Sequence, residues 1–64
     1  MFNASRLYRA SDPELEIIAS PGVLAQWRHR GVGPVYIKLS NRILYEGAAL
    51  NAWIEAHRVE PAAA

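Results

Sequence analysis

The sequence predicts a small α+β domain in which two short helices, a two-stranded β-hairpin and a closing C-terminal helix follow one another. Three observations predict this class: proline and glycine divide the chain into short segments, two β-rich runs flank a Ser-Asn pair, and the last segment repeats apolar residues at helical spacing. With 64 residues, the chain forms one domain. A domain this small buries only about 60% of the surface that its unfolded chain exposes.

The N-terminal part predicts an extended arm followed by a helix. Residues 1–11 lack helical periodicity, although polar and apolar residues alternate within them as in a short extended segment laid against the domain. A serine, an aspartate and a proline at positions 11–13 then provide an N-cap and a first turn. We expect the first helix over residues 12–19, at the start of a domain that spans residues 12–60.

A second helix is predicted to follow directly. Ser20 supplies its N-cap, Pro21 suits the first helical position, and Gly31 ends it. On a helical wheel Leu24 and Trp27 share the inward side. Four residues face away: Gly22, Ala25, Gln26 and His29.

Two β-rich runs, residues 35–39 and 42–45, predict a hairpin around Ser40-Asn41. A two-residue turn would place Ile37 opposite Leu44 and Tyr36 opposite Tyr45, whereas a longer loop would change these pairs.

The closing helix is expected to begin after Gly47 and to end at Glu60-Pro61, because apolar residues and His57 recur at one-face spacing between them. Residues 61–64 are expected to form a disordered tail. The core is expected from large apolar residues, and both tryptophans are expected in it rather than as stacking platforms for single-stranded nucleic acid. The core candidates are Tyr8, Leu24, Trp27, Tyr36, Ile37, Leu44, Tyr45, Leu50, Trp53 and Ile54.

Charge is unevenly distributed, although the formal net charge is only +1. No carboxylate occurs between Ser20 and Tyr45, and this block holds Arg28, Arg30, Lys38 and Arg42. All six acidic residues lie before or after it. One surface is therefore expected to be positive, the alternative being a merely solvated face.

The composition gives little support to catalysis. The chain has no cysteine, no glycine-rich phosphate loop and no pair of histidines at metal-ligand spacing. We therefore expect no enzyme activity, no catalytic residue, no metal, no cofactor and no small-molecule substrate. No apolar run approaches the ~18 residues of a membrane span, so we expect a soluble, cytoplasmic protein.

The order of elements is that of a winged helix-turn-helix, in which the second helix enters the major groove of DNA and the hairpin acts as the wing. Gln26 can pair with adenine and Ala25 can contact a thymine methyl group. Lys38 and Arg42 flank the hairpin tip and suit phosphates or a narrow minor groove, although charged residues also protect exposed strand edges.

Several segments together resemble the compact domain of excisionases and AlpA-type regulators, which are related to the MerR DNA-binding domain. These segments are Ser20-Pro21-x-x-Leu24-Ala25-x-Trp27-Arg28, Gly31-x-Gly33-Pro34-x-Tyr36-Ile37-Lys38-Leu39, Arg42-x-Leu44-Tyr45 and Leu50-x-Ala52-Trp53. The resemblance covers residues 20–59. It departs from the family in the short first helix and in the absence of glycine at the wing tip.

The resemblance implies a bacterial, nucleoid-associated recombination directionality factor of a mobile genetic element. Such a protein binds double-stranded DNA beside an attachment site, bends it cooperatively with neighbouring copies, and steers a tyrosine integrase toward excision. Its AlpA-type relatives are transcriptional regulators that bind promoters. The resemblance assigns groove reading to Ser20, Pro21, Gly22, Gln26, Arg28, His29 and Arg30, and wing contacts to Lys38, Ser40, Asn41 and Arg42.

A different class of function is also open. A protein-interaction adaptor without DNA binding would use the small-residue side of the last helix, formed by Ala48, Ala52, Ala56 and Val59.

Overall fold

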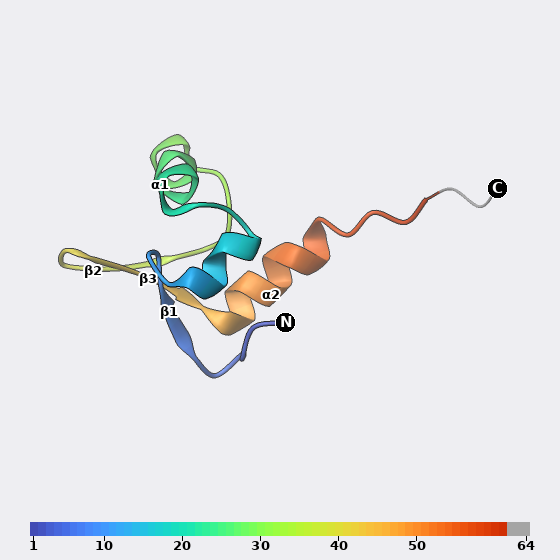
Figure 1. The fold of residues 1–64 in the computed structure, drawn as a ribbon, viewed down its shortest axis with the longest axis horizontal. Helices are drawn as coiled ribbons and strands as arrows, with labels where there is room; N and C mark the ends of the chain where they lie inside the picture. Colours follow the sequence, from blue (N-terminus) through green and yellow to red (C-terminus); the bar gives the residue numbers. More distant parts are fainter. Residues whose placement is uncertain (62–64) are drawn as a thin grey trace.

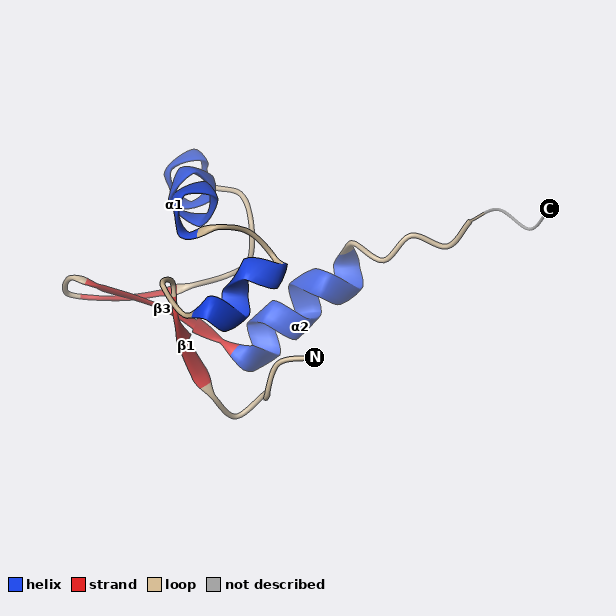
Figure 2. Cartoon of the chain, viewed as in Figure 1, coloured by secondary structure: helices blue, strands red, loops and turns tan. Residues whose placement is uncertain are grey.

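The computed structural model of the chain describes residues 1–61, so most of the predicted tail, residues 62–64, lies outside the described residues. The element order is β1 (Leu7–Arg9), the 3-10 helix η1 (Pro13–Ile17), α1 (Pro21–Arg30), β2 (Ile37–Leu39), β3 (Arg42–Glu46) and α2 (Gly47–Ala56) (Figure 1). The predicted α+β class is confirmed. The predicted number of elements is wrong. The described residues form two α-helices and a three-stranded antiparallel sheet, where three helices and a two-stranded hairpin were expected (Figure 2).

The predicted two-stranded hairpin is a three-stranded sheet with the order β1-β3-β2. β1 pairs with the free edge of β3, and Tyr8 lies opposite Tyr45. Both tyrosines are buried, which anchors the N-terminal segment to the sheet. This pairing satisfies backbone groups that a hairpin alone would leave exposed.

The predicted helix over residues 12–19 is wrong, because only the five residues of η1 are helical, and they form a 3-10 helix. Asp12 makes no side-chain cap bond to it, since its Oδ2 accepts from the backbone N–H of Arg9 at 3.0 Å. At the other end, the residue before Pro21 is extended, with ψ 159° at Ser20, as residues before proline prefer. Too few residues remain between these two constraints for an α-helix, and short stretches favour 3-10 geometry.

α1 begins and ends as predicted. The hydroxyl of Ser20 accepts from the N–H of Val23 at 3.3 Å, and Pro21 is the first helical residue. Gly31 is left-handed with φ 74°, a conformation that glycine adopts without steric cost. The N–H groups of Gly31 and Val32 then donate to the carbonyls of Arg28 and Trp27, which closes the helix end.

Of the two loop lengths that the sequence leaves open, the hairpin has the two-residue turn, which places Ile37 opposite Leu44. Tyr36 precedes β2, and its ring centroid lies 6.2 Å from that of Tyr45. Ser40 takes the left-handed conformation at the turn, with φ 53°.

α2 ends at Ala56, earlier than predicted. His57 follows as the C-cap: its Nδ1 lies 2.8 Å from the carbonyl oxygen of Trp53, and its ring centroid lies 4.0 Å from the Trp53 ring. A side chain that bonds a terminal carbonyl satisfies one of the acceptors that the end of a helix leaves free.

The core is smaller than predicted. The buried hydrophobic residues are Tyr8, Leu15, Leu24, Tyr45 and Leu50. Trp27 and Trp53 are half-buried and pack on each other, with ring centroids 5.5 Å apart. Tyr36 is exposed, so its predicted place in the core is wrong.

Candidate nucleic-acid interface

The predicted outward face of α1 is exposed. Gly22, Ala25, Gln26 and His29 are all exposed, as are Arg30 and the two residues at the helix start, Ser20 and Pro21. The first turn carries no acidic residue. Small and polar side chains at the start of the helix allow close approach to another surface, and the basic residues follow toward its end.

Arg28 differs from the other candidate residues of α1, because it is half-buried and engaged inside the protein. Its Nη1 donates to the hydroxyl of Tyr45 at 2.9 Å, and its guanidinium carbon lies 5.9 Å from the centroid of the Tyr36 ring. A DNA phosphate would have to compete with these contacts. Arg28 therefore connects α1 to the sheet and sets where the outward face of the helix lies.

We expect Arg28→Met and Tyr45→Phe each to lower the free energy of unfolding by about 1–2 kcal/mol, because each removes the same charge-assisted hydrogen bond. The double variant should lose less than the sum of the two, since the second substitution has no bond left to remove. Urea unfolding of the four proteins measures this coupling. If Arg28→Met is as stable as the wild-type chain, the hydrogen bond between Arg28 and Tyr45 does not stabilise the fold.

The candidate wing residues Lys38, Ser40, Asn41 and Arg42 are all exposed at the tip of the β2–β3 hairpin, which projects beyond β1 (Figure 1). The pairing register places Lys38 and Arg42 on opposite faces of the sheet. Lys38 lies opposite Ile43 and so shares the face of Tyr45, which α1 contacts through Arg28. Arg42 lies opposite Leu39, on the other face.

Arg9 is a candidate that the sequence reasoning missed. It pairs with Leu44 and therefore shares the outer face of the sheet with Arg42. A cleft of about 270 Å³ lies beside them, lined by Arg9, Ala10, Ser11, Asn41, Arg42 and Ile43. The alternation within residues 1–11 was the available signal for a strand, but it does not reveal which strand becomes its neighbour.

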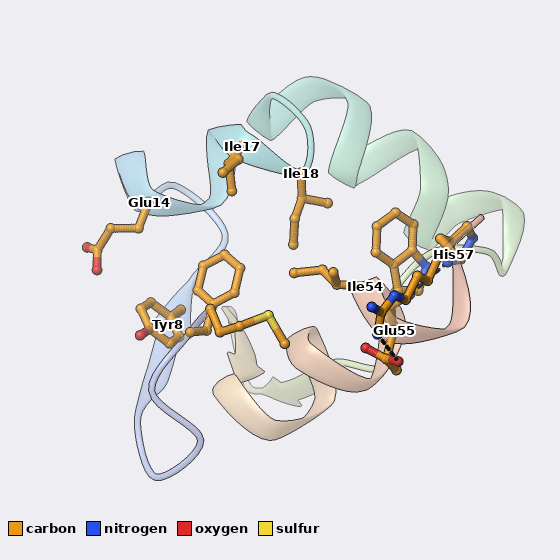
Figure 3. A pocket seen from close by; sticks show the side chains of 11 residues that line it. Tyr8, Glu14, Ile17, Ile18, Ile54, Glu55 and His57 are labelled. Atoms are coloured by element: carbon orange, nitrogen blue, oxygen red, sulfur yellow. Dashed lines mark hydrogen bonds and ion pairs between the residues drawn. The ribbon is translucent and has the colours of Figure 1, made fainter. Parts of the chain in front are cut away.

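A larger groove, of about 820 Å³, lies between the N-terminal residues, η1 and α2 (Figure 3). Its wall is mainly apolar and includes Phe2, Ile17, Ile18, Trp53 and Ile54. Charged residues at this groove pair within the chain. Arg6 and Glu14 lie 3.2 Å apart, as do Arg58 and Glu55.

Among residues 1–61, no cluster of three or more potential metal-ligating side chains occurs. In the same part of the chain, no helix has the length and apolar character needed to cross a membrane. Comparison with protein-family models, curated proteins and solved structures finds no significant match to this chain. The geometry of α1, the hairpin and β1 is therefore the basis for assigning a function.

Proposed function

We propose that this chain is a sequence-specific protein that binds double-stranded DNA as a winged helix-turn-helix, with α1 in the major groove and the β2–β3 hairpin as the wing. The segregation of charge carries this proposal. No carboxylate lies between Ser20 and Tyr45, which include α1 and most of the hairpin. Along the long axis of the molecule these two elements lie toward one end, and α2 with residues 57–61 lies toward the other (Figure 1).

Each exposed group has a distinct role in this complex. Gln26 reads a base edge, with Ala25 and Gly22 allowing the helix to approach the groove closely. His29 and Arg30 contact the groove edge or phosphates. Lys38 and Arg42 point to opposite faces of the hairpin, so a hairpin inserted in a groove brings one cation toward each bordering strand.

The biological role that we propose is that of an excisionase. The protein would bind near an attachment site at the bacterial nucleoid, cooperatively with neighbouring copies, and bend the DNA so that a tyrosine integrase excises a mobile element. Bending a site of two or three helical turns costs on the order of 1–6 kcal/mol, which several bound domains can supply together without any catalysis of their own. The resemblance over residues 20–59 supports this role.

A promoter-binding transcriptional regulator is the alternative within the same class, because one domain of this kind serves both roles. Stimulated excision by the purified protein, with binding beside an attachment site, supports the excisionase role. Promoter activation without any effect on an integrase would contradict it.

The experiment that tests DNA binding is a salt-series titration on random duplex DNA and on fragments from the neighbourhood of its own gene. We expect log affinity to fall by about 0.9 per log unit of salt for each phosphate neutralised, and one fragment to bind more tightly than random DNA. Fluorescence anisotropy at several salt concentrations measures both quantities. Absence of binding at low salt would remove the DNA-binding proposal.

A protein-interaction adaptor is the second candidate function, and the apolar groove favours it. Ile17 at this groove is 84% exposed, and the small-residue side of α2, with Ala48, Ala52 and Ala56, is exposed as well. A partner helix could cover either surface. The adaptor needs none of the cations of the hairpin, which separates it from the DNA-binding proposal.

A further inference from the structure

We infer that the cleft between the end of β1 and the hairpin binds one phosphate group of the DNA backbone, held by Arg9 together with Arg42. This inference rests on the proposed DNA binding and extends it to the N-terminal strand. It assigns a contact to a residue far in sequence from both α1 and the hairpin.

The cleft forms because β1 ends where the hairpin continues. Ala10 still donates to the carbonyl of Ile43 at 3.3 Å, and the N–H of Asp12 then donates to the carbonyl of Arg9 at 2.9 Å, which turns the chain away. The hairpin tip therefore overhangs the end of β1. The resulting depression of about 270 Å³ is open to solvent and large enough to admit a phosphate group.

The pairing register directs both arginines to this space. Arg9 lies opposite Leu44, and Arg42 is two residues before Leu44 on the same strand, so the two side chains are diagonal neighbours on one face. Diagonal positions lie about 7–8 Å apart, within reach of long side chains. Ser11 and Asn41 add a hydroxyl and an amide to the lining, and both can donate to a phosphate oxygen.

The guanidinium groups of Arg9 and Arg42 are uncommitted. Within residues 1–61 neither group forms a hydrogen bond or an ion pair, whereas Arg6, Arg28 and Arg58 each bond to another side chain. Asp12, the carboxylate nearest in sequence, accepts from the backbone of Arg9. Glu46 shares the face of Arg9 through the pairing register, but its carboxylate forms no ion pair with Arg9, and neither acidic residue lines the cleft. Two free planar guanidinium groups suit a phosphate, which they can bind through two parallel hydrogen bonds each.

The DNA backbone is a better source of this phosphate than a free ion. Both arginines are exposed, so a free anion would gain little over its hydration in water. A DNA molecule already held by α1 and the hairpin presents its phosphates at a high effective concentration. The cleft also lies on the face of the hairpin opposite to Lys38, so the domain would contact the backbone on both sides of the wing.

The test compares Arg9→Ala and Arg9→Lys with the wild-type chain and with Arg6→Ala as the matched control on the same N-terminal segment. We expect Arg9→Ala to weaken duplex binding about tenfold and to reduce the salt slope by about 1, because one phosphate contact is lost. Arg9→Lys should recover part of the affinity, since lysine keeps the positive charge but lacks the planar guanidinium that donates two parallel hydrogen bonds. Arg6→Ala should bind within twofold of wild type, and thermal melts should show all variants folded.

The inference is overturned if Arg9→Ala binds duplex DNA with wild-type affinity and a wild-type salt slope. If the wild-type protein does not bind duplex DNA at low salt, the proposed function is wrong and this inference fails with it. That result is obtained before any variant is compared. A parallel NMR titration with inorganic phosphate distinguishes a DNA phosphate from a free phosphate ion as the ligand of the cleft. Amide shifts at residues 9–11 and 41–43 should saturate with duplex, and saturation by millimolar phosphate alone would overturn the assignment to DNA.

Discussion

Replacing Lys38 and Arg42 together with alanine is expected to lower the affinity for duplex DNA by about 100-fold at low salt, because each cation contributes a phosphate contact of about 1.4 kcal/mol, or about tenfold. The salt slope should fall by about 2, one for each phosphate contact. Both side chains are exposed, so the melting temperature should stay unchanged. Fluorescence anisotropy across a salt series, with a thermal melt of each protein, checks all three expectations.

A matched control removes the same charge elsewhere. The double variant Arg6→Ala with Arg58→Ala loses two cations whose exposed ion pairs, with Glu14 and Glu55, contribute little to stability. Its DNA affinity should stay within about threefold of wild type, because long-range charge effects are screened by salt. Equal losses in both double variants would mean that net charge alone drives binding. Full biological activity of the hairpin variant would instead favour the adaptor.

Gly47→Ala is expected to destabilise the chain by about 2–3 kcal/mol. A Cβ at this buried position would overlap the carbonyl oxygen of Asn3, and the N–H of Gly47 donates to the carbonyl of Arg6 at 2.8 Å. The N-terminal segment would have to move, although it is held by two hydrogen bonds between the backbone of Phe2 and the side chain of Asn51. Urea unfolding and a thermal melt measure the loss, which corresponds to about 10–20 °C for a domain of this size.

The matched control for this glycine is Gly22→Ala. Gly22 also lies in the first turn of a helix, but a Cβ there meets no heavy atom within 4 Å. The substitution should therefore stabilise the chain by about 0.5–1 kcal/mol, since alanine loses less conformational entropy in a helix. Opposite signs at the two positions support close packing of the N-terminal segment on α2. A melting temperature of Gly47→Ala equal to that of wild type would contradict it.

The candidate interface was predictable where its signals are local. The face of α1 with Gln26 and His29 follows from helical periodicity, and the position of Lys38 and Arg42 near a tip follows from the turn between them. The cleft beside Arg9 was not predictable, because it depends on which strand becomes the neighbour of β3. The internal contact of Arg28 was missed for the same reason, since the hydroxyl that it bonds lies on another element.

The sequence by itself determined the α+β class and both ends of α1, because caps, proline and glycine act over a few neighbouring residues. It left the register of the hairpin open between two loop lengths, and the structure shows the two-residue turn. Only the tertiary structure decided that residues 7–9 complete the sheet, that residues 13–17 form a 3-10 helix and that α2 ends at Ala56. The first outcome depends on a partner far along the chain, the free edge of β3, which secondary-structure patterns do not specify. At the other two places the contacts are local: Asp12 bonds the backbone of Arg9 three residues before it, and His57 contacts Trp53 four residues before it. The residue pattern did not reveal which of the possible local contacts forms. The pairing of distant segments therefore settled the extent of the sheet, which local propensity left open.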